Sequence, residues 1–217
     1  MLNFHYNNPA RIFFGDGAEH NLYHLLKEYN VTSLMFVYSG NFVKTLGIWD
    51  AVKDACRRLD IDFLECGDVV PNPKIELIRS LIAVSKKRSV DFVLAAGGGS
   101  SVDTAKAIAL GIPYDGDVWD FFDQTAVPHC AVSIGAITTL PASGSETSNA
   151  AIISNGLMKL GFEDDMIIPK FAIMNPKYTL DLPAYQTSCG CADILSHLLE
   201  RYFSDTAHTD ATDYMIE

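Results

Sequence analysis

The sequence predicts an α/β fold in which parallel strands alternate with helices. Short apolar runs recur along the chain, and most are followed by a segment whose apolar residues repeat at helical spacing. Polar turns that contain glycine, asparagine or proline separate the two kinds of segment. Because strand-helix-strand units cross over in the right-handed sense, we expect helices on both faces of the sheet and ligands beyond the carboxyl ends of its strands.

The amino-terminal part of the chain supplies the first strands and helices. Leu22, Leu25 and Leu26 form an apolar stripe at helical spacing, and the apolar run 34–38 ends at a polar turn over residues 39–41. The expected elements are an edge strand or hairpin near Arg11–Phe14, a helix over 18–29, a strand over 34–38, helical segments through Val43 and Leu46 and over 49–59, a strand over 61–64, and a helix over 75–82 that follows the turn 71–73.

The central part continues the alternation and then changes character. After a strand over 92–96 and a helix through Val102, Ala105, Ile108 and Ala109, we expect a polar and aromatic loop over 114–124, a strand over 131–137 and a strand over 171–174. Asn175, Pro176, Asp181 and Pro183 then interrupt the pattern before an all-helical stretch. We therefore place a domain boundary near Leu182, with an α/β domain over 1–182 and the opening of a helical domain over 183–217.

Three consecutive glycines join the strand over 92–96 to the helix that follows. Gly97, Gly98 and Gly99 give the backbone freedom to adopt positive φ and let a ligand approach the main chain, and Ser100 or Ser101 can cap the helix. The first N–H groups and the dipole of such a helix attract an anion. The run is not the GxGxxG fingerprint, because Val102 occupies the place of the third glycine. Taken alone, it fits a phosphate site and a turn without a ligand equally well.

Composition excludes several classes of partner. With 48% hydrophobic and 11% aromatic residues the chain should fold, and its formal net charge of -11 disfavours nonspecific binding to nucleic acid or anionic lipid. The amino terminus does not read as a signal peptide, and no apolar run reaches the ~18 residues of a membrane span. We expect a soluble, cytoplasmic protein without nucleic-acid or membrane partners. Reduced thiols are expected for the scattered cysteines Cys56, Cys66, Cys130, Cys189 and Cys191.

A second chemical signal lies in the helical stretch. Asp193 and His197 are four residues apart, so both project from one helix face, and Glu200 follows on nearly the same side. A carboxylate and an imidazole at that spacing can reach one divalent cation. On spacing alone, however, a solvated hydrogen-bonding pair is the commoner arrangement.

Taken together, six ordered motifs resemble the iron-dependent alcohol dehydrogenase family, and most closely its butanol dehydrogenase and NADPH-dependent aldehyde reductase branch. The resemblance runs the whole length of the chain. The motifs are NPARIFFG over 8–15, PNP over 71–73, GGGSSVDTAK over 97–106, TTLPASGSE over 138–146, PKFAIMNP over 169–176 and CADILSHLLERY over 191–202.

The resemblance implies a Rossmann-like nucleotide-binding α/β domain, a helical metal-binding domain, and a cleft between them. By matching motifs, Gly98, Gly99 and Ser100 face the cofactor pyrophosphate. The dinucleotide is further contacted by Asn72, Thr138, Thr139 and Lys159, of which Lys159 lies in a poorly matched loop. Asp193 and His197 become metal ligands and catalytic residues, and Asp103 a hydrogen-bond acceptor rather than a catalytic base.

The cofactor preference is argued from the end of the strand over 34–38. An acidic side chain there accepts hydrogen bonds from a ribose 2′-hydroxyl and repels a 2′-phosphate. This chain has Gly40 instead, with Ser39, Asn41 and Lys44 nearby and no carboxylate. We therefore predict NADP(H) over NAD(H).

The implied reaction is hydride transfer between the nicotinamide and a small primary alcohol or aldehyde. A ferrous or zinc ion would act as Lewis acid, and an aspartate with a histidine does not separate the two metals. For full-length members of the family the resemblance implies a homodimer.

Family members extend beyond Glu217 and donate two further histidine ligands from their helical domain. Because a catalytic metal normally needs about three protein ligands, the isolated chain should be inactive or nearly so. It should also expose the apolar face Ile194, Leu195, Leu198 and Leu199. Three interpretations stay open: a metal-dependent dehydrogenase represented by a fragment, a nucleotide-binding module without catalysis, and a relative such as a polyol dehydrogenase or dehydroquinate synthase.

Overall fold

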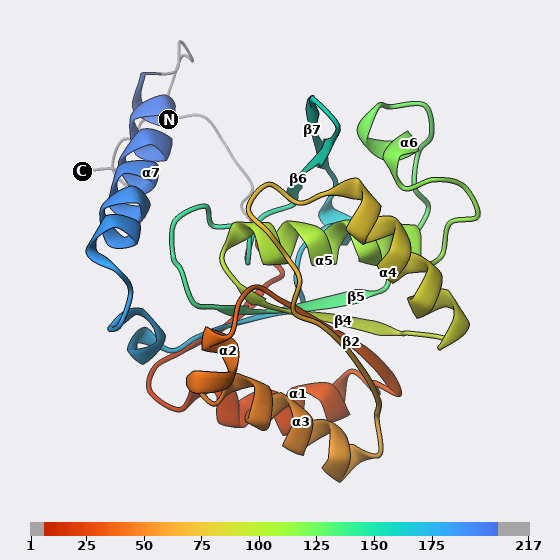
Figure 1. Ribbon diagram of the computed structural model, residues 1–217, viewed down its shortest axis with the longest axis horizontal. Coiled ribbons are helices and arrows are strands. Elements are labelled where there is room, and N and C mark those ends of the chain that lie inside the picture. The colour runs from red at the N-terminus through yellow and green to blue at the C-terminus, as the bar shows by residue number, and fades with distance from the viewer. Residues whose placement is uncertain (1–6, 204–217) are drawn as a thin grey trace.

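A six-stranded sheet with strand order β1-β8-β5-β4-β2-β3 forms the centre of the computed structural model, which describes residues 7–203 (Figure 1). Every neighbouring pair in this sheet is parallel, as the alternating pattern predicts. The strands are β1 (Arg11–Phe14), β2 (Ser33–Tyr38), β3 (Asp62–Cys66), β4 (Phe92–Gly97), β5 (Ser133–Thr138) and β8 (Phe171–Met174).

Helices cover both faces of the sheet (Figure 1). On one face α1 (Leu22–Glu28) and α3 (Ile48–Leu59) enclose one cluster of buried side chains, and on the other α4 (Ile75–Lys87) and α5 (Gly99–Gly111) enclose a second. Every residue of β2 and of β4 is buried, which is the usual condition of central strands in a parallel sheet. The remaining short helices are η1 (Ala18–Asn21), α2 (Phe42–Thr45), α6 (Trp119–Phe122), η2 (Asp165–Ile167) and η3 (Pro176–Thr179).

A β-hairpin that the sequence reading did not predict follows β5. Its strands β6 (Ala150–Asn155) and β7 (Met158–Glu163) pair antiparallel and form a separate two-stranded sheet. Asn155 pairs with Met158, so Gly156 and Leu157 form the two-residue turn, and Gly156 takes a φ of 59°. A glycine at the first position of a two-residue turn is a hairpin signal and could have revealed it. Likewise, the segment expected as a loop over 114–124 contains the buried helix α6.

The start of α5 differs from expectation. The helix begins at Gly99, and Gly98 is its N-cap residue without a side-chain hydrogen bond, so the prediction that Ser100 or Ser101 caps it is wrong. Gly97 adopts a φ of 146°, and a Cβ there would lie 2.4 Å from Ser101 Oγ. A glycine is required at this position because other residues rarely adopt this backbone conformation and because a Cβ atom would collide with Ser101.

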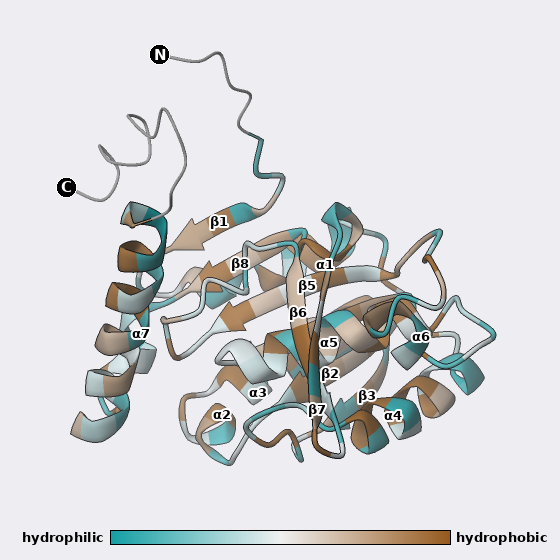
Figure 2. Ribbon diagram, turned by 90° about the horizontal axis from the view of Figure 1, so that it is seen from above, coloured by the Kyte–Doolittle hydropathy of each residue, from teal (hydrophilic) through white to brown (hydrophobic). Residues whose placement is uncertain are grey.

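One long helix, α7 (Ala184–Tyr202), follows the sheet domain and lies beyond the carboxyl ends of the strands, as the arrowheads of β1, β8 and β5 show (Figure 2). Among its residues only Gly190 is buried. Over residues 7–203 the expected helical domain amounts to this helix, and the rest of the predicted segment, 204–217, lies outside the described residues. No helix over 7–203 is long and apolar enough to cross a membrane.

Candidate functional site

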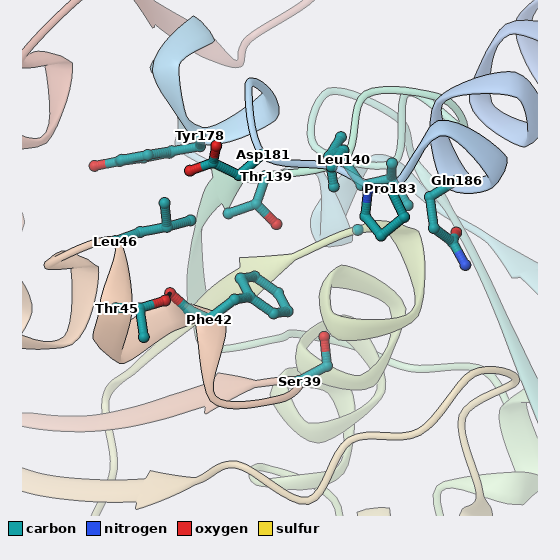
Figure 3. A pocket seen from close by; sticks show the side chains of 12 residues that line it. Ser39, Phe42, Thr45, Leu46, Thr139, Leu140, Tyr178, Asp181, Pro183 and Gln186 are labelled. Carbon is teal, nitrogen blue, oxygen red and sulfur yellow. Dashed lines mark hydrogen bonds between the residues drawn. The ribbon is translucent and has the colours of Figure 1, made fainter.

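A cavity of about 350 Å³ opens at the carboxyl ends of β2, β4 and β5 (Figure 3). Phe42 and Leu46 lie on one side of it, and Tyr178 and Asp181 lie on the other. Its walls are mainly apolar, which suits a flat ring system, and polar groups are placed at the strand ends. The lining residues are Ser39, Phe42, Thr45, Leu46, Gly98, Thr139, Leu140, Tyr178, Asp181, Leu182, Pro183 and Gln186.

The glycine turn forms part of the cavity wall. Gly98 lines the cavity with an extended backbone, and a Cβ built on it would lie 3.4 Å from Leu140 Cβ, an ordinary contact. The Ser101 amide donates to the Gly98 carbonyl over 3.0 Å, whereas the N–H groups that precede it at the start of α5 point out of the helix end, where an anion can bind. A Cβ on Gly99 would lie 2.5 Å from Ser143 Oγ, so this glycine permits close approach of the loop that follows β5. Ser100 is part of the same first turn of α5.

The end of β5 brings two hydroxyls next to the glycine turn. The Thr139 amide donates to the Gly97 carbonyl over 3.1 Å, which fixes the two strand ends side by side. Thr139 lines the cavity, and both Thr138 and Thr139 are buried. Within the described residues the Thr138 Oγ1 atom is buried without a hydrogen-bond partner. A buried polar atom without a partner is costly, and a bound ligand would supply one.

The hairpin brings Lys159 to Asn72, although the two are far apart in sequence. Lys159 lies on β7 and its Nζ donates to Asn72 Oδ1 over 2.8 Å. Asn72 has a φ of 57°, a left-handed conformation that asparagine tolerates better than most residues. Two predicted cofactor-binding residues therefore meet, but neither lines the cavity of Figure 3.

Gly40 lies in a second, more polar cavity of about 570 Å³ on the other side of the turn after β2. Its φ is 71°, and Lys44 lines the same space. Two carboxylates, those of Glu65 and Asp68, also line it. The expectation that no carboxylate lies near Gly40 is therefore wrong, because β3 ends beside β2 and brings these residues in from another part of the chain.

A buried ammonium group supports the loop that follows β5. Lys106 Nζ donates to Ser145 Oγ over 3.1 Å, to the Ser148 carbonyl over 2.9 Å and to the Ala150 carbonyl over 2.7 Å. Burial lowers the pKa of Lys106 to about 8. Lys106 is not among the site residues predicted from the sequence, although a single lysine on an otherwise apolar helix face is a signal of a buried charge.

Asp103 completes this network. Its carboxylate accepts from Ser145 Oγ over 2.6 Å and from the Ile152 amide over 3.2 Å. Burial raises its pKa, while these hydrogen bonds and Lys106 act in the opposite direction. These contacts are consistent with the predicted role as hydrogen-bond acceptor.

The two predicted metal ligands lie on α7. His197 Nε2 and Asp193 Oδ1 are 3.8 Å apart, and both side chains are about half exposed. Between residues 7 and 203 no group of three or more His, Cys, Asp or Glu side chains could hold a metal ion. The pair has the right donor types for iron or zinc, but the described residues offer only these two as ligands of one ion.

Comparison with known proteins identifies the family. The model of iron-containing alcohol dehydrogenase matches residues 9–176. The NADH-dependent butanol dehydrogenase A of Clostridium acetobutylicum is 40% identical over 206 residues, which are 94% of this chain and 53% of the relative. The NADPH-dependent aldehyde reductase YqhD of Escherichia coli is 34% identical over 223 residues, which are 100% of this chain and 56% of the relative.

The crystal structure of NADH-dependent butanol dehydrogenase A from Thermotoga maritima superposes with a TM-score of 0.89 at 36% identity, over 94% of this chain and 52% of that one. This chain thus spans about half the length of the relatives that it matches. The family match, the shared sheet and the glycine turn agree with the resemblance seen in the sequence. The chain belongs to the iron-containing alcohol dehydrogenase family and is similar to its butanol dehydrogenases and to the aldehyde reductase YqhD.

Proposed function

We propose that this protein is an NAD(P)-dependent oxidoreductase that transfers a hydride between a nicotinamide dinucleotide and a small primary alcohol or aldehyde. The observation that carries the proposal is the cavity at the carboxyl ends of β2, β4 and β5, one wall of which is Gly98. Ligands of open parallel sheets bind at such strand ends. The names of the matched relatives, butanol dehydrogenase and aldehyde reductase, support the substrate class and favour it over a polyol.

The chain's residues fit the parts of a dinucleotide. Gly98, Gly99 and Ser100 would hold the pyrophosphate at the start of α5, because that helix end attracts an anion and Gly98 leaves the backbone accessible. The apolar walls between Phe42 and Tyr178 would enclose the adenine ring. Further contacts are assigned to Thr138, Thr139, Asn72 and Lys159. When bound, the nicotinamide supplies the hydride chemistry, and the protein orients it and excludes water.

Asp193 and His197 are proposed as two ligands of a divalent iron or zinc ion, with the helical part over 183–217 as a metal-binding domain and 1–182 as the nucleotide-binding domain. Such an ion would supply Lewis acidity toward the carbonyl oxygen. Since the described residues offer no third ligand, a second candidate function is nucleotide binding without catalysis by this chain. The homodimer expected of full-length relatives stays a prediction that sedimentation can test.

The sequence and the structure favour different substituents at the 2′ position of the dinucleotide ribose. The sequence argument for NADP(H) rests on Gly40, and the structure adds Glu65 and Asp68 to the same cavity. Among the relatives, the butanol dehydrogenases are named as NADH-dependent and the aldehyde reductase as NADPH-dependent. The proposal for the whole site is therefore a nicotinamide dinucleotide of either kind, and titration with both tests the preference for NADP(H) that the sequence alone predicts.

Titration of the protein with NADH and NADPH, followed by nicotinamide fluorescence, tests the proposed function. Replacement of Gly98 by alanine should weaken binding about tenfold or more, because the new methyl group enters the cavity and displaces the pyrophosphate from the helix N–H groups. Folding should be unaffected, since the φ of Gly98 is -91° and the nearest contact is ordinary. Gly161→Ala on β7, whose Cβ would lie 3.8 Å from its nearest neighbour, is the control. Absence of binding by the unaltered protein would refute the proposal.

A further inference from the structure

The cavity around Gly40 adjoins the proposed dinucleotide site through the turn after β2. Ser39 lines the first cavity, and Gly40 with Asn41 lines the second, so consecutive residues separate the two spaces. β2 lies directly beside β4, which carries the glycine turn, and Tyr38 pairs with Ala96. In dinucleotide-binding sheets the ribose hydroxyl is read at the end of the strand next to the glycine turn. The Gly40 cavity therefore lies where the 2′ position of the adenosine ribose would be recognised.

Asp68 reaches this place from a different strand. β3 pairs with β2, and beyond the last paired residues an isolated antiparallel bridge joins Asp68 to Ser39. The Val69 amide donates to the Tyr38 carbonyl over 3.4 Å and holds the two chains together. Bridge partners have Cα atoms about 4.5–5.5 Å apart, so the Asp68 carboxylate is within side-chain reach of the 2′ position. Asp68 is exposed and faces the cavity that it shares with Gly40 and Lys44.

The charges of the cavity favour a hydroxyl over a phosphate. Its ionisable lining consists of the carboxylates of Glu65 and Asp68, the ammonium of Lys44, and the groups of Tyr38 and Cys66, whose pKa values burial raises so that they stay neutral. Two carboxylates against one ammonium leave a net negative charge. A 2′-phosphate would add roughly two more negative charges.

The two carboxylates do not play the same part. Glu65 Oε2 already accepts a hydrogen bond from the Tyr38 hydroxyl over 3.1 Å and another from the Trp49 indole N–H. Lys44 Nζ lies 5.7 Å from the centre of the Trp49 ring, whose N–H donates to Glu65. Glu65 is thus held by hydrogen bonds to the cavity wall, whereas Asp68 lies next to the turn over 39–41 that follows β2.

We propose that Asp68 is the specificity-determining residue of the cofactor site: it accepts a hydrogen bond from the 2′-hydroxyl of the adenosine ribose and repels a 2′-phosphate, so that NAD(H) binds in preference to NADP(H). Recognition of the 2′-hydroxyl would thus come from the end of β3, because Gly40 at the end of β2 has no side chain that could accept the hydrogen bond. This inference rests on the proposed function, because it assumes that a dinucleotide occupies the site.

The test is the ratio of the dissociation constants for NADPH and NADH in the unaltered protein and in Asp68→Asn. The unaltered protein should prefer NADH, and the variant should lower the ratio about tenfold or more, through both weaker NADH binding and tighter NADPH binding. ADP and 2′,5′-ADP as competing probes should give the same shift, since they occupy only the adenosine half. Asp115→Asn makes the same charge change at an exposed position on the loop between α5 and α6 and should leave the ratio unchanged.

The binding measurements distinguish failure of the role proposed for Asp68 from failure of the proposed function. A preference for NADPH in the unaltered protein, or a ratio that stays within about twofold in Asp68→Asn, would overturn the role of Asp68 while the proposed function stands. Failure of the unaltered protein to bind either dinucleotide or either probe would instead overturn the proposed function, and the inference with it. Thermal unfolding of Asp68→Asn checks that the variant is folded.

Discussion

At the scale of single residues, Lys106 is the one charged side chain among the buried residues of the described part of the chain. Its side chain is fully buried, and its ammonium is surrounded by oxygen acceptors of the loop and hairpin that follow β5. A buried cation is tolerated only when it is paired and hydrogen-bonded. Lys106 thereby fixes the segment over 145–150 to α5, next to the strand end that carries Thr139.

Replacement of Lys106 by methionine should lower the free energy of unfolding by about 3 kcal/mol, because buried carbonyl oxygens lose their hydrogen-bond donor and the Asp103 carboxylate loses a nearby positive charge. Urea unfolding followed by circular dichroism measures this difference. Lys87→Met, at an exposed position of α4, should change it by less than about 0.5 kcal/mol. A loss as small as that of the Lys87 variant would contradict a structural role for Lys106.

The cost of Lys106→Met should also depend on pH. Burial lowers the folded-state pKa to about 8, below the 10.5 of an unperturbed lysine, so between these values the unfolded chain binds more protons. The contribution of Lys106 to the free energy of unfolding therefore rises with pH across this window. The difference between the two proteins should be larger at about pH 9.5 than at about pH 7. Equal differences would show that the folded-state pKa is not lowered.

At the scale of elements, α7 differs from the other long helices because only one of its residues, Gly190, is buried. Ile194, Leu195 and Leu199 are 40%, 58% and 50% exposed, which agrees with the apolar face expected from the sequence, and Leu198 is less exposed. Contiguous exposed apolar surface promotes association between protein molecules.

We expect the protein to self-associate through this face of α7. Lysine at both Leu195 and Leu199 should shift the sedimentation profile toward the monomer, because it replaces apolar surface with charge. Ser196→Lys adds a charge to the same helix without removal of apolar surface and should shift it much less. If the double variant associates as strongly as the unaltered protein, another surface is responsible.

Secondary structure was predictable where local periodicity is strong. β2, β4, β8, α3 and α4 lie where the apolar pattern places them, within a few residues. The hairpin of β6 and β7 was missed although β6 is apolar and partly buried and apolar residues alternate with others along β7. Helix α6 was missed because its polar flanks resemble a loop. The cap of α5 was misassigned because serine favours such positions in general, whereas here the backbone of the glycine turn decides where the helix starts.

At the scale of the whole molecule, the candidate site consists of strand ends that meet at one edge of the sheet, with α7 beyond them (Figure 1). Pro183 and Gln186, at the start of α7, line the cavity, while Asp193 and His197 lie further along the same helix. In the proposed function, residues over 7–203 would build the dinucleotide part of the site, and Asp193 and His197 are two proposed ligands of the metal part.

The 217-residue chain, supplied with Fe²⁺ or Zn²⁺, NAD⁺ or NADP⁺ and 1-butanol, should bind the dinucleotide but show little or no alcohol oxidation. The two ligands proposed within residues 7–203 lie on one helix and would bind a metal ion weakly and without a defined geometry, whereas catalytic sites use about three protein ligands. Absorbance of the reduced nicotinamide measures turnover, and Asp193→Ala is the control. Metal-dependent turnover that Asp193→Ala abolishes would show that this prediction is wrong.

The sequence by itself determined the parallel α/β sheet, the glycine turn at the end of β4 and the family, because these depend on residues close together in the chain. Only the tertiary structure decided which side chains share a cavity. Asp68 stands beside Gly40, Lys159 beside Asn72, and Lys106 beneath the loop after β5, since strands far apart in sequence end at the same edge of the sheet. Electrostatic interactions depend on distance in space and not in sequence, so the charge around Gly40 could not be read from the strand that carries it.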